Sequence, residues 1–177
     1  MKTIVYIDGQ NFLYKAADVL ISTTKTASKQ QLDGMNIRMV IESVLADIGD
    51  YDPENTTIRY YGTKRIKRVT RFGDAIREKS IRFADNLRRI RSALSRCNVD
   101  YIEAGQLQVR DSDECHNCHT RDYRFQEEGV DVRLAVDMAN DAITKNVERI
   151  ILVSSDTAIA YLSNGCFVSK DLAVYML

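Results

Sequence analysis

The chain has 177 residues, of which 45% are hydrophobic and 28% are charged, and its formal net charge is zero. This length and composition predict one globular domain, spanning residues 1–177, with a substantial core. No apolar run approaches the roughly 18 residues that a membrane-spanning helix needs, and the start of the chain lacks the pattern of a signal peptide. We therefore expect a cytoplasmic protein with no membrane partner, in which the four cysteines are free or metal-bound.

The neutral total hides a strong segregation of charge. Residues 59–96 contain thirteen Lys and Arg against three Asp and Glu, whereas residues 97–141 contain eleven acids against four bases. Such asymmetry indicates an anionic partner at one region and cation binding at the other. A solvated helix face explains the same charges equally well.

The first strand is predicted at Ile4–Ile7, where four apolar or β-favouring residues follow one another without alternation. This pattern is typical of a strand buried on both faces of a parallel sheet. The run stops at Asp8, and Asn11 follows near the start of a helix. Because ligands bind outside the carboxyl ends of strands in open α/β sheets, Asp8 is expected in a binding site.

The remaining elements follow in alternation along the chain. Helices are expected at residues 12–20, 35–48, 75–95 and 129–145, and strands at 56–61, 99–109 and 150–153, with a short strand at 173–177. A polar insert that carries Cys and His is expected at about 110–128. For the helix at 129–145, the helical wheel predicts a core face made of Val132, Val136, Ala139 and Ile143.

Strand–helix alternation predicts right-handed crossovers, which bring the ends of the strands to one edge of the sheet. Asp156 ends the strand at 150–153, so Asp8 and Asp156 are expected to converge, and Asp131 to join them from the first turn of its helix. Clustered carboxylates select Mg²⁺ or Mn²⁺, and such a site can activate water for attack on a phosphodiester. Helix capping is the structural alternative for Asp131 and Asp156. Asp137 is not expected to share the site, because it lies about 120° from Asp131 around the helix.

Three segments resemble the signature blocks of NYN domains, which belong to the PIN-like superfamily of metal-dependent ribonucleases. They are Ile7-Asp8-Gly9-Gln10-Asn11, the segment 129–137 and the segment 151–156. The resemblance implies a Rossmann-like, three-layer α/β/α fold with a mainly parallel central sheet, together with Mg²⁺ or Mn²⁺ and cleavage of RNA. It also implies that Asp8, Asp131 and Asp156 are the catalytic, metal-binding acids and that Asn11 shapes the turn after the first strand.

One departure from that family weakens the expectation of catalysis. Family members usually carry a further acid two or four residues after the equivalent of Asp156, where this chain has Ala158 and Ala160. The segment after about residue 160 is also expected to be atypical or truncated. A catalytically weakened module that binds RNA, a protein partner or a second copy of the chain is the main alternative. A phosphatase of the haloacid-dehalogenase type is a third, although Gln10 stands where that chemistry normally needs a second Asp.

The insert contains Cys115-His116-Asn117-Cys118-His119, which formally matches a haem-attachment motif. Haem attachment requires export, for which the sequence gives no signal. We therefore expect either structural Zn²⁺ held by Cys115, Cys118 and His119, with Cys97 as a candidate fourth ligand, or unliganded thiols. A redox CxxC motif is less compatible, since it normally opens a helix after a strand.

A basic cluster follows the strand at 56–61. If that strand runs parallel to the first, the cluster leaves the sheet at the same edge as Asp8. It would then bind the RNA phosphate backbone without reading sequence. The residues expected to bind substrate in this way are Lys64, Arg65, Lys67 and Arg68, together with Asn11 beside Asp8.

Overall fold

The computed structural model describes residues 2–24, 35–48, 52–64, 74–111, 123–144, 147–155 and 173–176. Its centre is a sheet of five strands in the order β3-β2-β1-β6-β7, and every neighbouring pair is parallel. The prediction of a mainly parallel sheet is therefore confirmed. The strands are β1 (Thr3–Asp8), β2 (Thr56–Gly62), β3 (Asp100–Glu103), β6 (Arg149–Val153) and β7 (Ala173–Met176).

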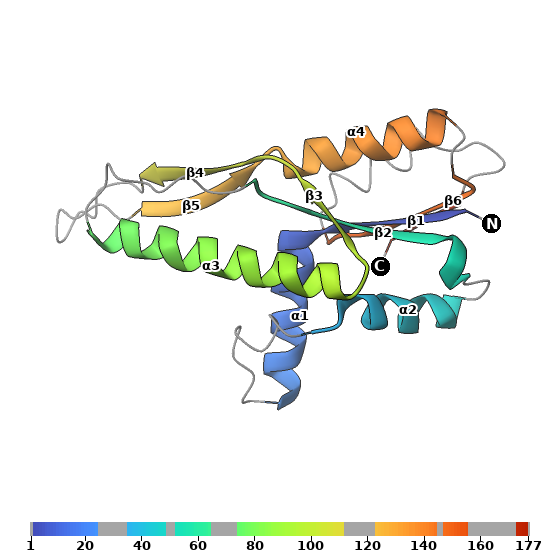
Figure 1. Cartoon of the computed structure of the whole chain (residues 1–177), viewed down its shortest axis with the longest axis horizontal. Helices are drawn as coiled ribbons and strands as arrows, with labels where there is room; N and C mark the ends of the chain where they lie inside the picture. The colour runs from blue at the N-terminus through green and yellow to red at the C-terminus, as the bar shows by residue number, and fades with distance from the viewer. Residues whose placement is uncertain are drawn as a thin grey trace.

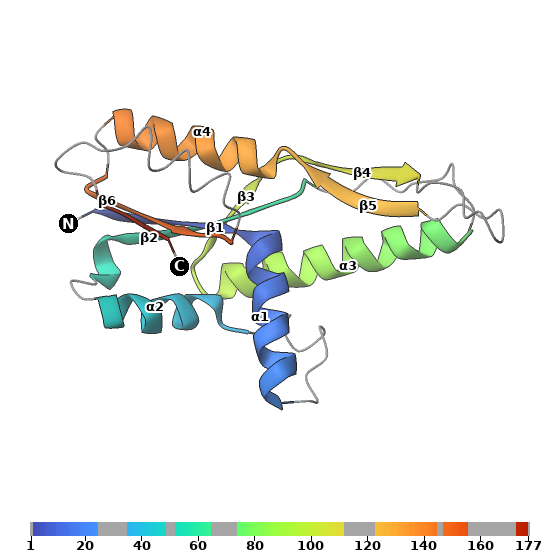
Figure 2. The ribbon, with the colours of Figure 1, turned by 180° about the vertical axis from the view of Figure 1, so that it is seen from behind.

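Helices cover both faces of this sheet, which gives the predicted three layers. One face carries α4 (Val130–Ile143), and the other carries α2 (Ile37–Ile48) and α3 (Asp74–Arg96) (Figure 1). Helix α1 (Gly9–Thr24) leaves the end of β1 on the same side as α2 and α3 (Figure 2). No helix in the described part of the chain is long and apolar enough to cross a membrane.

Strand β1 is the centre of the core, and all six of its residues are buried. Ile4 and Tyr6 pack in the cluster beneath α4, whereas Val5 and Ile7 pack in the cluster formed with α2 and α3. Both faces of the strand are therefore covered by helices. This explains why its sequence is continuously apolar rather than alternating.

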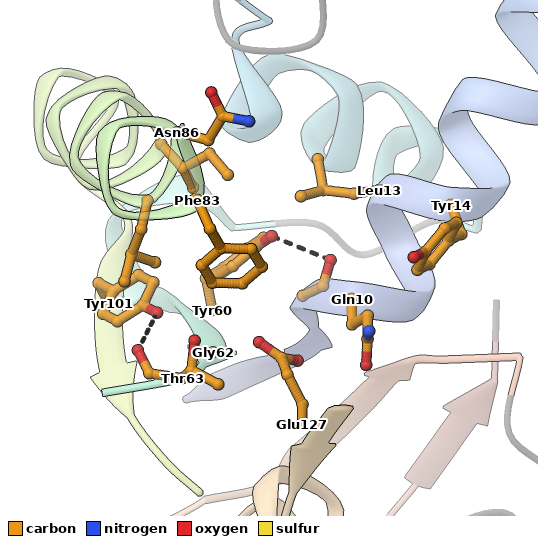
Figure 3. Close-up of a pocket in the computed structure, with 13 residues that line it drawn as sticks. Gln10, Leu13, Tyr14, Tyr60, Gly62, Thr63, Phe83, Asn86, Tyr101 and Glu127 are labelled. Atoms are coloured by element: carbon orange, nitrogen blue, oxygen red, sulfur yellow. Dashed lines mark hydrogen bonds between the residues drawn. The ribbon is translucent and has the colours of Figure 1, made fainter. Parts of the chain in front are cut away.

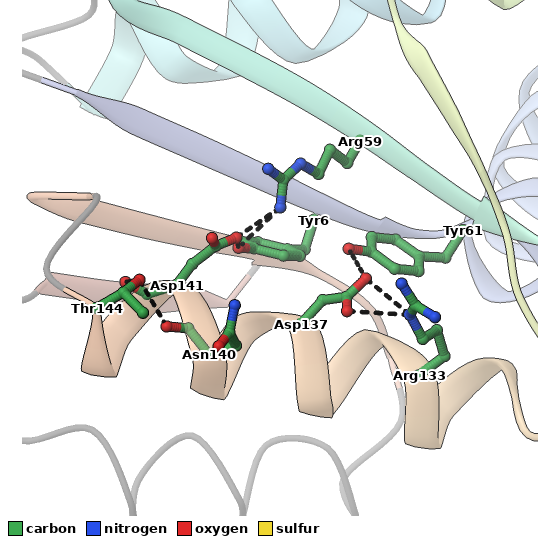
Figure 4. Close-up of polar contacts among 8 residues, drawn as sticks. All are labelled: Tyr6, Arg59, Tyr61, Arg133, Asp137, Asn140, Asp141 and Thr144. Carbon is green, nitrogen blue, oxygen red and sulfur yellow. Dashed lines mark hydrogen bonds and ion pairs between the residues drawn. The ribbon is translucent and has the colours of Figure 1, made fainter.

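The predicted core face of α4 is wrong. Val132, Val136 and Ile143 are 61%, 57% and 78% exposed, whereas the helix buries Val130, Leu134 and Met138. Two carboxylates explain the rotation, because Asp137 and Asp141 point at the sheet and bind tyrosine hydroxyls there (Figure 4). A helical wheel that counts only apolar residues cannot foresee a sheet-facing side with acids in it.

These acids dock α4 onto the sheet. The Tyr6 hydroxyl donates a hydrogen bond of 2.5 Å to Oδ2 of Asp141, which also pairs with the Arg59 guanidinium at 2.5 Å (Figure 4). The Tyr61 hydroxyl donates to Oδ2 of Asp137 at 3.1 Å. Burial, with the neighbouring carboxylates, raises the pKa of both tyrosine hydroxyls, so they stay protonated as donors. Asp137 thus has a structural partner of its own.

The strand predicted at 99–109 is divided into two strands that belong to different sheets. After β3 the chain turns at Gly105, which has a φ of +61°, and continues as β4 (Gln106–Asp111). β4 pairs antiparallel with β5 (Tyr123–Glu128), so part of the expected polar insert is a hairpin that extends alongside α3 (Figure 1). Residues 112–122, which include Cys115, Cys118 and His119, lie outside the described residues.

The other helices and strands agree with prediction to within a few residues. Helix α1 begins at Gly9, three residues earlier than expected, and a 3-10 helix at Pro53–Asn55 precedes β2. The short C-terminal strand is confirmed as β7.

Candidate functional site

Asp8 is the last residue of β1, immediately before α1, and only 6% of it is exposed. Its Oδ1 accepts the backbone N–H of Asn11 at 3.2 Å, so the carboxylate caps the first turn of the helix. The Asn11 side chain donates a second hydrogen bond, of 2.6 Å, from Nδ2 to Oδ2 of Asp8. Asn11 therefore orients the carboxylate rather than capping a helix itself.

The end of β6 reaches the same carboxylate. β6 lies beside β1, with Val153 opposite Ile7, and the next residue, Ser154, donates from Oγ to Oδ2 of Asp8 at 3.2 Å. Ser155 donates from Oγ to Oδ1 of Asn11 at 3.3 Å. The predicted convergence of these two strand ends is therefore present. Sequence reasoning missed the two serines, although the strand-end argument that selected Asp8 applies to them as well.

An open pocket of about 410 Å³ joins Asp8 to Asp131. Asp131 lies exposed in the first turn of α4, after Gly129, which adopts a φ of +80°. The structure therefore brings two of the three predicted acids to one pocket, which we call the Asp8 pocket. Its other lining residues are Gln10, Asn11, Gln126, Glu127, Glu128, Gly129, Val130 and Val132. The third acid, Asp156, lies outside the described residues.

Glu127, on β5, is a site residue that the sequence did not reveal. Burial raises the pKa of its carboxyl group, the negative charge of Asp8 raises it further, and nearby polar groups of Thr63 lower it. The hairpin thus carries a partly buried acid into the electrostatic field of Asp8. The sequence signal for it is its position two residues before the 129–137 segment.

The chemistry of this lining suits a hard divalent cation. Carboxylates of Asp8, Asp131 and Glu127 and amide oxygens of Asn11 and Gln126 all line the pocket, and Mg²⁺ and Mn²⁺ prefer such oxygen ligands. Within the described ranges, however, no three His, Cys, Asp or Glu side chains are grouped closely enough to hold a metal ion. A complete ligand set would therefore need a further group such as Asp156.

The zinc and basic-cluster predictions fall largely on residues that are not described. Cys97 is a half-buried free thiol, whereas Cys115, Cys118 and His119 lie outside the described residues, so structural zinc stays a prediction. Lys64 is exposed and follows β2, which runs parallel to β1 with Tyr61 opposite Asp8. It therefore leaves the sheet at the Asp8 edge, as expected. Arg65, Lys67 and Arg68 are not among the described residues.

Comparison with known proteins yields one family and several distant likenesses. The chain is 25% identical to 6-hydroxy-3-succinoylpyridine 3-monooxygenase HspA of Pseudomonas putida, over 90% of this chain and 54% of that protein. It thus spans about half the length of the curated relative that it matches. A protein of unknown function from Vibrio parahaemolyticus superposes with a TM-score of 0.44 and 15% identity, covering 99% of this chain and 81% of that one. T5 5′-exonuclease with bound zinc ions gives a TM-score of 0.44 and 9% identity, covering 99% and 55%.

The family model of the NYN domain matches residues 2–165 of this chain. That range holds every described element except β7. It also spans the three segments on which the sequence resemblance was based. The chain belongs to the NYN domain family.

Proposed function

We propose that this chain is a Mg²⁺- or Mn²⁺-dependent ribonuclease that hydrolyses RNA phosphodiester bonds at Asp8, Asp131 and Asp156. The observation that carries the proposal is the setting of Asp8. A buried carboxylate at the end of the central strand is oriented by Asn11 and Ser154 and opens onto a pocket that Asp131 also lines. Acids in such surroundings serve chemistry more often than packing.

Each residue has a definite role in this proposal. Asp8, Asp131 and Asp156 would hold the cation, and Asn11 would fix the orientation of the Asp8 carboxylate. A bound divalent ion would activate water and stabilise the leaving oxygen. Lys64 and the basic residues that follow it would bind the RNA backbone at the same edge of the sheet.

The test is cleavage of single-stranded RNA by the purified protein with Mn²⁺. Chelation by EDTA and the Asp8→Asn substitution should each abolish cleavage, because each removes the cation from the site. Urea unfolding of Asp8→Asn would establish that the variant is folded. Cleavage that is equal with and without metal would contradict the proposal.

A non-catalytic RNA-binding module is the second candidate. Ala158 and Ala160 favour it, because they replace the acid that NYN proteins usually carry after the Asp156 position. Measuring RNA affinity in EDTA separates the two candidates. Tight binding without cleavage in any divalent metal supports the module.

The monooxygenase relative raises a third candidate, in which the ligand is a small pyridine rather than RNA. The observation that favours it is an aromatic pocket beside Asp8, described below. Binding of a hydroxypyridine to the folded protein, measured against binding of nucleotides, distinguishes the two ligand classes.

A further inference from the structure

A second pocket, of about 220 Å³, adjoins the Asp8 pocket and shares Gln10 and Glu127 with it (Figure 3). Its lining is mainly aromatic and aliphatic, and we call it the aromatic pocket. The ribonuclease proposal gives it no role. Its other lining residues are Gly9, Leu13, Tyr14, Tyr60, Gly62, Thr63, Phe83, Asn86, Leu87, Ile90 and Tyr101.

The tyrosine rings of this pocket are held in place by hydrogen bonds to backbone oxygens. The Tyr60 hydroxyl donates to the backbone oxygen of Gly9 at 2.9 Å, and the Tyr101 hydroxyl donates to that of Thr63 at 2.7 Å. The two rings stack with centroids 5.9 Å apart. Phe83 projects from α3 into the same space (Figure 3). The tyrosines therefore present fixed ring surfaces, with their hydroxyls already bonded.

Four polar side chains interrupt this apolar lining, namely Gln10, Thr63, Asn86 and Glu127. Thr63 is fully buried, and its hydroxyl and backbone lie close enough to Glu127 to lower the pKa of that carboxyl group. Glu127 is the one acid among them, and its carboxylate is directed into the pocket (Figure 3).

The size of the pocket limits what it can bind. An apolar cavity of about 150 Å³ accepts benzene, whereas drug-sized ligands occupy pockets of about 300 Å³ or more. A volume of about 220 Å³ therefore suits one planar ring system of one or two rings. Unstacked RNA bases are bound in this way, by stacking on aromatic side chains and by hydrogen bonds to their edges.

We propose that the aromatic pocket is a base subsite that accepts one unstacked nucleobase of the RNA, with a preference for guanine. The inference rests on the proposed ribonuclease function, because a base held here would lead its phosphate toward the adjoining Asp8 pocket. The preference follows from Glu127, since an ionised carboxylate only accepts hydrogen bonds. Guanine offers two adjacent donors, N1–H and the N2 amine, whereas the other three bases place an acceptor beside each donor.

Calorimetric titration with GMP, AMP, CMP and UMP in EDTA tests the subsite without any cleavage. Wild type should bind GMP most tightly. Phe83→Ala should weaken binding of every nucleotide by roughly 5- to 150-fold, the range measured for loss of base stacking. Phe83→Leu keeps most of the apolar volume without the ring and should also weaken binding. Each variant is checked for folding by urea unfolding.

Glu127→Gln should reduce the preference for GMP over AMP by about tenfold, since it removes a charged acceptor. Glu78→Gln is the matched control, because Glu78 is an exposed carboxylate on α3 outside both pockets, and it should leave nucleotide binding unchanged.

GMP binding in a protein that does not cleave RNA would still support the subsite. RNA cleavage without detectable nucleotide binding would overturn the subsite and leave the ribonuclease proposal standing. Binding of 2-hydroxypyridine, where the four nucleotides fail to bind, would also overturn it.

Discussion

Asp8 and Glu127 line the same pocket, and the charge of Asp8 adds to burial in raising the pKa of the Glu127 carboxyl group. Asp8 is placed by the central strand β1 and Glu127 by the β4–β5 hairpin, which belongs to a different sheet. The hairpin thus brings a second carboxylate to the edge of the central sheet at which Asp8 lies. This relationship gives a pH-dependent prediction.

Glu127→Gln should stabilise the protein at neutral pH. Because the folded pKa of Glu127 is raised, the unfolded chain loses the proton first as the pH increases, so the free energy of unfolding falls across that range. Glu127 does not destabilise the fold in this way below the unfolded pKa of about 4.3, because its carboxyl group is then protonated in both the folded and the unfolded state. Urea unfolding at several pH values should show a gain for Glu127→Gln at neutral pH that disappears in acid. A difference in unfolding free energy between Glu127→Gln and wild type that stays constant with pH would contradict this prediction.

Loss of the Asp141 carboxylate should destabilise the fold. Asp141→Ala leaves the buried Tyr6 hydroxyl without its acceptor and Arg59 without its ion pair. The expected loss is about 1–3 kcal/mol of unfolding free energy. Asp85→Asn, which removes a half-exposed carboxylate that pairs with Arg88 of the same helix, should change stability by less than about 0.5 kcal/mol. Equal effects of the two substitutions in urea unfolding would argue against the docking role of Asp141.

The glycine at the start of the hairpin should tolerate alanine less well than the glycine before α4. Both have positive φ, which costs alanine about 1–2 kcal/mol. A Cβ on Gly105 would also lie 2.3 Å from the backbone oxygen of Glu128, whereas the nearest atom to one on Gly129 is 3.7 Å away. Gly105→Ala should therefore cost about 1–3 kcal/mol more than Gly129→Ala. Similar midpoints for the two variants in urea would contradict the close approach.

Removal of the Asn11 side chain should weaken metal binding and RNA cleavage together. Asn11→Ala deletes the 2.6 Å hydrogen bond that orients Asp8, and the loss of such a supporting residue typically costs about 10- to 100-fold in metal affinity or activity. Mn²⁺ titration and cleavage rates provide the two measurements. Ser155→Ala, which removes a hydrogen bond to Asn11 rather than to Asp8, should have a smaller effect. Wild-type affinity and rate in Asn11→Ala would show that the carboxylate needs no such support.

The parts of the fold that sequence predicts well are those governed by burial on both faces. Continuous apolar runs identified β1 and β6, and their parallel pairing followed from the strand–helix alternation. The approach of Asp8 and Asp131 to one pocket is also predictable, because strand ends and helix starts fall at one edge of the sheet. The buried face of α4 was not predictable in this way, since Asp137 and Asp141 bond to tyrosines that are distant in sequence.

Glu127 shows a second limit of sequence reasoning. The composition of residues 110–128 predicts only a polar insert that carries Cys and His, whereas β4 and β5 form a ladder between segments that are distant in sequence. Only that pairing, with the turn at Gly105, carries Glu127 to the junction of the two pockets. Neither the alternation of apolar and polar residues nor the local composition predicts this position of Glu127.

The most direct test of the central claim is the rate of single-stranded RNA cleavage in Mn²⁺ by wild type, Asp8→Asn and the surface control Asp85→Asn. Wild type and Asp85→Asn should both cleave the RNA, and only in the presence of the metal ion. Asp8→Asn should lose at least about 100-fold in rate, more than the loss typical of a residue that only supports a ligand. Equal rates for wild type and a folded Asp8→Asn protein would contradict this claim.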